Sequence, residues 1–360
     1  MSKVFFTDMR CRVGTSLLHK LGSLLDKAGF AQIPFTKRYA AVKIHFGEPG
    51  NLSALRPNYA KTVADKITAL GGRPFLTDCS TLYVGRRSNA LDHLESAWEN
   101  GYNALSCGCP ILMGDGLKGT DDVEVPVPGG QLLKTALIGR TVMDADIIIS
   151  LSHFKGHECA GFGGALKNIG MGCGSRAGKM VMHNDGKPQV YPGACTGCRF
   201  CSRSCAHGAI SFGADGKARI DHTKCVGCGR CIGSCAFHAI ENDSAGANDT
   251  LSKKIAEYTA AVLAGREHFH ISVAAQISPY CDCHGDNDAA IVPDIGIFAS
   301  FDPVAIDRAC IDAVNAAPSL RDGQAGDHFS GIHPAANWRA ALDHAEAIGL
   351  GEQQYNIVRI

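Results

Sequence analysis

The amino-acid sequence predicts an α/β fold: a mainly parallel sheet covered by helices, with a small α+β domain inserted into it. Strand-like and helix-like segments alternate outside residues 188–242, which is typical of a sheet with helices on both faces. The run Ile147-Ile148-Ile149 is apolar without alternation, as expected of a strand buried on both faces. A cysteine-rich repeat within residues 188–242 indicates the inserted domain.

The N-terminal part of the chain supplies three expected strands, at residues 4–7, 39–46 and 73–78. A helix is expected after the first strand, because a hydroxyl side chain at residue 15 or 16 can cap it and the leucines that follow lie on one face. A second helix has apolar residues at helical spacing and ends at Gly71-Gly72. A third is expected at residues 88–100.

The C-terminal part continues the same alternation. Residues 143–152 contain the best candidate for a buried strand, and a helix at 251–263 leads into a strand at 270–276. Asp302 is well placed as the N-cap of a further helix, with Pro303 at its first position. A helix at about 335–348 and a strand at 355–359 complete the expected sheet and its cover.

Composition excludes several classes of protein. The chain of 360 residues has 35 basic and 35 acidic side chains, so no overall charge favours nucleic acid or an acidic membrane surface. Its N-terminus lacks the long apolar core of a secretory signal, and no apolar run is long enough to span a membrane. We therefore expect a soluble, cytoplasmic protein. In that reducing compartment, 17 cysteines indicate metal binding and not disulfides.

The cysteine-rich repeat is the strongest signal in the sequence. Residues 195–210 read CTGCRFCSRSCAHGAI and residues 225–240 read CVGCGRCIGSCAFHAI, with nine of sixteen positions identical. Each half has the spacing C-x2-C-x2-C-x3-C, in which three cysteines bind one [4Fe–4S] cluster and the fourth binds the other. One predicted cluster is held by Cys195, Cys198, Cys201 and Cys235. The second predicted cluster is held by Cys225, Cys228, Cys231 and Cys205.

The repeat resembles a bacterial two-cluster ferredoxin, with short strands expected near 210–212 and 218–220. One difference is that the proline usual after the fourth cysteine is Ala206 in one half and Ala236 in the other. Paired zinc sites are the alternative, but four cysteines in eleven residues fit zinc poorly. Polar linkers place the ferredoxin-type domain at 188–242 and the discontinuous α/β host domain at 1–187 and 243–360.

A polar, glycine-rich segment follows the buried strand, where parallel sheets bind their ligands. Its charged and amide side chains can bind and protonate a small anionic substrate, and we take five as candidate catalytic residues: His153, Lys155, His157, Lys167 and Asn168. The helix expected to begin near Ala165 can present its N–H groups to a carboxylate or phosphate. A tightly packed glycine loop without a ligand is the alternative.

Two further groups of polar residues follow other strands. The C-x-C-H run at 281–284 can hold a metal beyond the two clusters, with candidate ligands Cys281, Cys283, Cys159 and Cys173. It can equally be a pair of reduced thiols on a turn. His45 with Glu48, Asp78, and Arg86 with Arg87 lie near the ends of the first strands and can converge on one cleft.

The whole chain resembles the domain-of-unknown-function 362 family, whose members are commonly described as "iron–sulfur center protein". The residues that carry this resemblance are the run HFKGH…GFGGALKNIGMG, the run CDCHGDND at 281–288 and the run PDIGIFASFDPVAIDRACID at 293–312. The ferredoxin-type insert lies between the first and second. The resemblance implies a two-cluster protein, frequent in anaerobes, and brings no assigned reaction.

These observations lead to a functional hypothesis, an iron–sulfur oxidoreductase. The insert would relay electrons between a redox partner protein or low-potential carrier and a small anionic molecule on the host domain. The alternatives are an electron carrier without its own substrate, and a maturation factor that transfers iron or clusters. No nucleic acid and no membrane are expected as partners. The substrate, the direction of electron flow, the cluster potentials and the oligomeric state do not follow from the sequence.

Overall fold

The computed structural model describes residues 1–360 except 84, 184–186, 228–229, 238, 243–245 and 322–325. Its centre is an eight-stranded sheet in the order β16-β1-β15-β14-β7-β2-β3-β4. All neighbouring strands pair in parallel except β15, which is antiparallel to both β1 and β14. The expected α/β fold with a mainly parallel sheet is confirmed. The strands are β1 Ser2–Asp8, β2 Tyr39–Lys43, β3 Arg73–Asp78, β4 Ile111–Met113, β7 Ile147–His153, β14 Glu267–Ala274, β15 Gly296–Ser300 and β16 Tyr355–Arg359.

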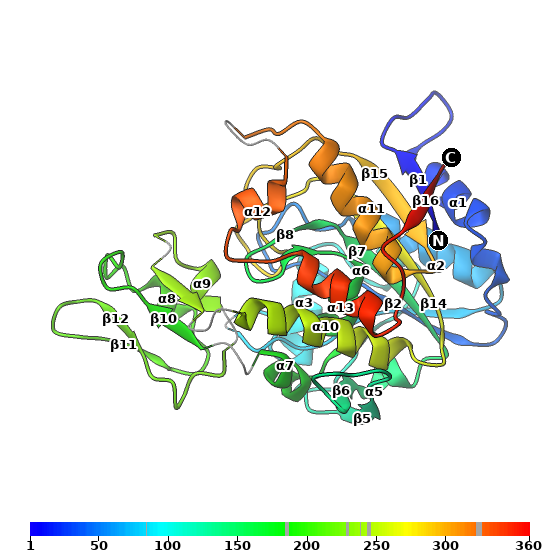
Figure 1. The fold of residues 1–360 in the computed structure, drawn as a ribbon. Helices are drawn as coiled ribbons and strands as arrows, with labels where there is room; N and C mark the ends of the chain where they lie inside the picture. The colour runs from blue at the N-terminus through cyan, green and yellow to red at the C-terminus, as the bar shows by residue number, and fades with distance from the viewer. Residues whose placement is uncertain (84, 184–186, 228–229, 238, 243–245, 322–325) are drawn as a thin grey trace.

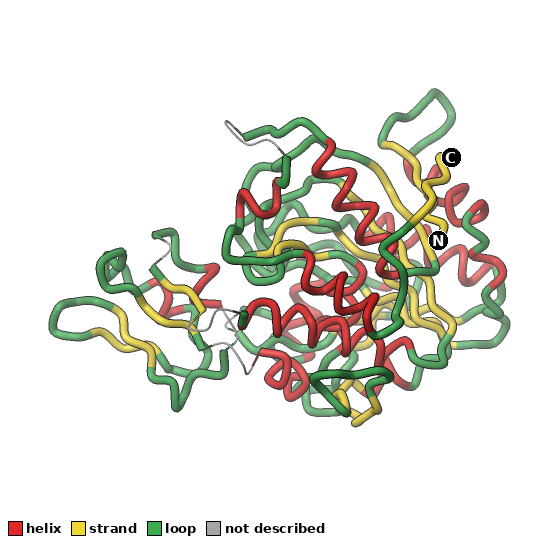
Figure 2. The backbone as a smooth tube through the Cα atoms, viewed as in Figure 1, coloured by secondary structure: helices red, strands yellow, loops and turns green. Residues whose placement is uncertain are grey.

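The central strand β7 is buried on both faces, as its sequence predicts. Ile147 and Ile149 pack into the core on one side of the sheet, and Ile148 packs into the core on the other. Helices α1 Leu17–Lys27 and α2 Pro57–Ala69 supply apolar residues to the first side. Helices of the second side (Figures 1 and 2) are α6 Ala165–Cys173, α10 Ala247–Leu263, α11 Pro303–Ala316 and α13 Arg339–Ala347.

Two helix starts follow the capping chemistry expected from the sequence, and a third has a cap that the sequence analysis did not name. The Asp302 carboxylate accepts hydrogen bonds from the backbone N–H groups of Val304 and Ala305, and Pro303 is the first residue of α11. Ser16 caps α1 in the same way. Helix α3 Ala90–Glu99 begins after Asn89, whose side chain accepts from the N–H groups of residues 91 and 92.

Several elements have no signal in the sequence that we recognised. Two of them form hairpins, β5 Asp122–Pro126 with β6 Thr135–Gly139 and β8 Lys155–His157 with β9 Gly161–Gly163. Helix α7 Arg176–His183 follows α6 directly. Shorter elements are η1 Phe30–Gln32, α4 Ala104–Cys107, α5 Arg140–Met143 and α12 His328–Ile332.

The cysteine-rich segment has its own secondary structure, beside the body that contains the sheet (Figure 1). Strand β10 Pro188–Val190 pairs with β13 Ile240–Asn242, and β11 Ile210–Phe212 pairs with β12 Ala218–Ile220, both antiparallel. The two strands expected near 210–212 and 218–220 are therefore confirmed. Two one-turn helices, α8 Phe200–Arg203 and α9 Arg230–Gly233, complete the segment. The domain limits at 188 and 242 stay predictions. Among the described helices, none is both long and apolar enough to cross a membrane.

Candidate functional site

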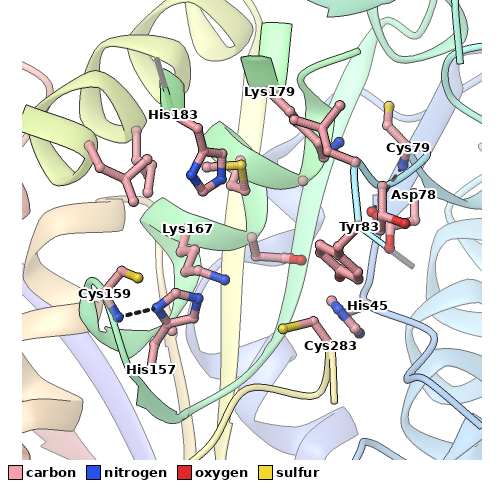
Figure 3. Close-up of a pocket in the computed structure, with 18 of the residues that line it drawn as sticks. His45, Asp78, Cys79, Tyr83, His157, Cys159, Lys167, Lys179, His183 and Cys283 are labelled. Carbon is pink, nitrogen blue, oxygen red and sulfur yellow. Dashed lines mark hydrogen bonds between the residues drawn. The ribbon is translucent and has the colours of Figure 1, made fainter. Parts of the chain in front are cut away.

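A cavity of about 90 Å³ lies at the carboxyl ends of the parallel strands β2, β3 and β7. Helices α6, α7 and α10 form its other walls, and Figure 3 shows the side chains that point into it. This is the place where a parallel α/β sheet is expected to bind a ligand. The ionisable side chains of its lining are mainly basic: Lys43, His45, Asp78, Arg87, Lys155, His157, Glu158, Lys167, Lys179, His183 and Arg230, with the thiols of Cys79, Cys159 and Cys283.

One wall of the cavity contains a buried ion pair. The Lys43 ammonium lies 2.9 Å from the Asp78 carboxylate, and these side chains are 1% and 4% exposed. Burial alone would raise the pKa of Asp78, but Lys43 and the nearby His93 hold it well below its ordinary value. Lys43 also donates to Oδ1 of Asn168. Both charges of this pair are compensated within the protein.

The strand-end groups at His45, Glu48 and Arg87 do converge on this wall. Arg87 donates from Nε to the Glu48 carboxylate at 2.8 Å, and its Nη1 lies 3.0 Å from Nε2 of His45. A third nitrogen donates to the Tyr83 hydroxyl at 2.6 Å. Arg86 instead faces outward, where it pairs with two glutamates of α3. Arg87 is therefore compensated, and the Arg86 side chain does not line the cavity.

Four of the five predicted catalytic residues line the cavity, namely Lys155, His157, Lys167 and Asn168. Lys155 lies 3.0 Å from the buried carboxylate of Asp282. The Asn168 amide donates at 2.9 Å to the backbone carbonyl of Lys43, which positions α6 against β2. His153 is not among the lining residues. Its ring lies between the Asp282 carboxylate, at 2.8 Å, and the Ala275 carbonyl oxygen, at 2.9 Å.

The ring of His157 is held by the backbone. Its Nδ1 accepts hydrogen bonds from the N–H groups of Cys159 and Ala160, each at 3.1 Å; Figure 3 draws the bond from Cys159. Burial, together with the Lys167 charge, holds the pKa of His157 well below its ordinary value. A neutral ring that accepts at Nδ1 carries its proton on Nε2. His157 is therefore a hydrogen-bond donor, through Nε2.

The two cysteines of the C-x-C-H run lie beside this histidine. Cys283 lines the cavity, whereas Cys281 is not among the lining residues. A ring nitrogen of His157 and the sulfurs of Cys281 and Cys283 lie within 4.8 Å of one another. The hydrogen bond with Cys281 lowers the pKa of the Cys283 thiol to about 7, and the same bond raises the pKa of Cys281. The ammonium of Lys167 lies 3.5 Å from the sulfur of Cys281.

The other two cysteines predicted as metal ligands are placed differently. Cys159 lines the cavity, but in the described part of the chain neither it nor Cys173 belongs to a group of three or more possible metal ligands. Cys173 lies deeper, where its carbonyl oxygen accepts from the Cys79 thiol. Two such groups form in the described chain: His157 with Cys281 and Cys283, and Glu158 with Cys283 and His284. A metal on Cys281 and Cys283 stays a prediction.

Helix α7 supplies two lining residues that the sequence analysis missed. Lys179 and His183 are four residues apart and so share one face of the helix. Burial, with the nearby charges of Lys167 and Lys179, lowers the pKa of His183 to about 4. Among the described residues, no carboxylate lies within ion-pair distance of Lys167 or Lys179. The spacing of Lys179 and His183, four residues apart after the glycine-rich segment, is the sequence feature that could have identified them.

Among its described residues, the cysteine-rich segment contributes Arg230 to the lining of the cavity. Arg230 donates to the backbone carbonyl of Cys283 at 2.7 Å, and its Nη1 lies 3.2 Å from Nδ1 of His284. Its guanidinium stacks on the Tyr83 ring, 4.7 Å from the centroid. His284 in turn lies 2.8 Å from the carboxylate of Glu158. Arg230 directly precedes a predicted cluster ligand, Cys231, so the segment reaches the cavity next to that ligand.

The predicted anion site at the N-terminus of α6 is wrong. The N–H groups of Ala165 and Leu166 donate to the two oxygens of Asp307, at 2.7 and 2.9 Å. A buried carboxylate of the protein itself therefore occupies this position. Gly164 is required there, because a Cβ atom would lie 2.2 Å from an oxygen of Asp307. Burial raises the pKa of Asp307 to about 7, although both N–H groups oppose the shift.

The predicted cluster ligands gather in two sets. One small cavity is lined by the sulfur-bearing residues Cys195, Cys198, Cys201 and Cys235. A second is lined by Cys205, Cys225 and Cys231. Cys228 lies outside the described residues. Backbone N–H groups donate to several of these sulfurs, as Ala239 does to Cys235 at 3.3 Å. These residues fit the two predicted [4Fe–4S] clusters, and the clusters stay a prediction.

The fold and the site define a cysteine-rich α/β protein with a basic cavity at the carboxyl ends of its parallel strands. The chain belongs to the family described as Domain of unknown function (DUF362), which matches residues 40–312.

Two solved structures are similar to part of the fold. They are the lactate racemase apoprotein from Thermoanaerobacterium thermosaccharolyticum, at 10% identity and a TM-score of 0.33, and a protein from Thermotoga maritima, at 12% identity and a TM-score of 0.37. The matches cover 76% and 83% of this chain but only 50% and 57% of those proteins. No curated protein matches the sequence.

Proposed function

We propose that this chain is an iron–sulfur redox protein in which the cysteine-rich insert relays electrons to or from a small anionic molecule in the basic cavity. The observation that carries the proposal is Arg230. It lies next to Cys231 in sequence, and it contacts Cys283 and Tyr83 in the lining of the cavity. An insert whose only task was to carry electrons elsewhere would have no need to contribute to this lining.

The insert would hold two [4Fe–4S] clusters. The two cysteine sets around separate small cavities support this assignment, since each set draws its fourth member from the other half of the repeat. Such clusters, when bound, supply electrons one at a time. The side chains of the host domain would bind the substrate and supply its protons.

The lysines of the cavity that have no carboxylate partner in the described chain support an anionic substrate. Lys43, Arg87 and Lys155 each have a carboxylate partner. Lys167 and Lys179 face the same cavity without one in the described chain, and His183 lies near both. A carboxylate or phosphate would compensate these charges. His157 would donate from Nε2 to an oxygen of the substrate, and the pKa of His183 would rise beside a bound anion, which suits it to deliver a proton.

Iron and sulfide counts test the clusters first. Anaerobically purified protein should contain about eight iron and eight sulfide per chain and give the EPR signals of reduced [4Fe–4S] clusters. Protein with zinc in place of iron, and without sulfide, would contradict the proposal.

Calorimetric titration with small carboxylates and phosphate tests the cavity. A Lys167→Met or Lys179→Met substitution removes one charged hydrogen bond, worth about 1.5–3 kcal/mol, and should weaken binding about 10- to 100-fold. Lys134→Met, at an exposed lysine, is the matched control. Equal binding by all three variants would exclude this cavity as the anion site.

A further inference from the structure

We propose that Cys281 and Cys283 form a redox-active dithiol that reacts with a small anionic disulfide bound in the basic cavity. Cys283 is the attacking thiolate and Cys281 is the resolving thiol. The inference rests on the proposed function in one respect, since it takes the basic cavity as the substrate site. It adds the class of substrate and the two atoms that react.

The positions of the two sulfurs differ in the way that this reaction requires. Cys283 lines the cavity and can meet a bound molecule, whereas Cys281 is not among the lining residues. Both are nearly buried, at 9% and 1% exposure, and their sulfurs lie within 4.8 Å of each other. A nucleophilic cysteine that attacks a carbonyl needs no second thiol. A cysteine that attacks a disulfide does, because the mixed disulfide must be resolved.

Cations surround the pair. The Lys167 ammonium lies 3.5 Å from the sulfur of Cys281. Arg230 is fixed at Cys283 by its hydrogen bond to the backbone carbonyl. Positive charge favours the thiolate, which is the reactive form of cysteine. The same Lys167 faces the cavity with Lys179, so a substrate that carries a carboxylate would bind with its sulfur near Cys283.

The imidazoles beside the pair are not arranged as metal ligands. A histidine that binds a metal through one nitrogen normally donates its other N–H to an acceptor. At His157 the reverse holds, since Nδ1 accepts from two backbone N–H groups. At His284 both nitrogens are engaged, one by Arg230 and one by Glu158. Two adjacent thiols whose neighbouring imidazoles are both engaged in this way are well placed to react with each other.

The chemistry balances in two steps. The Cys283 thiolate attacks one sulfur of the substrate R–S–S–R′, which forms a Cys283–S–S–R bond and releases R′–S⁻. The Cys281 thiol then attacks the sulfur of Cys283, and its proton goes to the departing R–S⁻. This forms the Cys281–Cys283 disulfide and releases the second thiol. Restoring the Cys283 thiolate and the Cys281 thiol takes two electrons, which the proposed relay would deliver one at a time, and one proton, which solvent supplies.

The experiment uses the holoprotein with Cys11→Ser, which removes an exposed thiol outside the repeat. The protein is incubated without oxygen with glutathione disulfide, and its peptides are mapped by mass spectrometry. We expect a Cys281–Cys283 disulfide and two thiols released per chain. Cys281→Ser should instead retain one glutathione on Cys283, and Cys283→Ser should retain none. Cys310→Ser, at a buried cysteine of α11, should behave like the parent. Iron content and melting temperature, measured alongside, identify variants that fail to fold.

Two results would overturn the inference. One is a parent protein in which Cys281 and Cys283 stay reduced while other cysteines react. The other is a metal ion beyond the clusters that resists chelators in the parent and is absent from both serine variants. The proposed function fails separately: if the disulfide forms but reduced methyl viologen never reopens it, the dithiol stands and the electron relay does not. If a cavity ligand is reduced while both thiols stay unchanged, the relay stands and the dithiol does not.

Discussion

The cysteine-rich insert and the basic cavity differ in how their functional residues are brought together. In the insert, each set of cysteines comes from one short loop and a single residue of the other half of the repeat. In the cavity, the lining comes from β2, β3, the β8–β9 hairpin, α6, α7, α10, the loop at 281–284 and the insert. The first arrangement depends on local spacing, and the second depends on the whole fold. Substitutions in the two regions should therefore fail in different ways.

The largest expected effect is on metal content in the insert. Cys201→Ser and Cys231→Ser each remove one predicted ligand of a different cluster, so each should lower the iron content from about eight to about four per chain. Cys310→Ser, in the apolar core of the host domain, should leave iron unchanged. Iron and sulfide analysis with EPR measures both. Equal iron loss in all three variants would show that the cysteines act through folding and not as ligands.

The next effect is on stability in the host domain. Lys43→Met removes the nearest cation of the buried Asp78 carboxylate, with Arg87 left at 3.9 Å, and should lower the free energy of unfolding by about 3 kcal/mol. The exposed pair Lys61–Asp65 is the control, and Lys61→Met should cost less than about 0.5 kcal/mol. Denaturant unfolding followed by the fluorescence of the two tryptophans, Trp98 and Trp338, reports on the host domain. Similar losses in both variants would contradict the burial argument.

A smaller effect is the change of stability with pH that Asp307 should cause. The pKa of Asp307 is about 7 in the folded protein and near 3.8 when unfolded, so between these values the folded state binds more protons. The free energy of unfolding should therefore fall by about 1–3 kcal/mol as pH rises from 5 to 8. The contribution of Asp307 is complete only below the pKa that this residue has in the unfolded chain. Asp307→Asn removes the titration and should flatten the profile. A parent whose stability rises over this range would show that the two N–H groups outweigh burial.

The smallest effect joins the two regions. Arg230→Met removes the hydrogen bond to Cys283 and the contact with Tyr83, worth about 1 kcal/mol together, so hydrogen exchange at residues 281–284 should accelerate several-fold. Arg219→Met, at an exposed arginine in the same insert, is the control. Unchanged exchange in Arg230→Met would mean that the insert does not hold the loop.

The contrast between local spacing in the insert and long-range assembly in the cavity also explains how well each region could be predicted from the sequence. The spacing of cysteines and the caps at Ser16, Asn89 and Asp302 are local features, and the sequence analysis found the elements that depend on them. The reversed strand β15 has no local signal, because its direction depends on neighbours at the N-terminus and at β14. Asp307 lies 142 residues from Ala165, so its occupation of the α6 N-terminus is visible only in the folded chain.

The contact of Arg230 with the cavity has a consequence for the order of assembly. The host domain supplies all eight strands of its sheet, but the insert adds Arg230 to the lining of the cavity. If the insert takes up its shape only around its clusters, as metal-dependent domains do, the cavity stays unfinished until they arrive. Arg230 would then reach its position in the cavity only in a chain that has its clusters, and a chain without clusters could not bind its substrate.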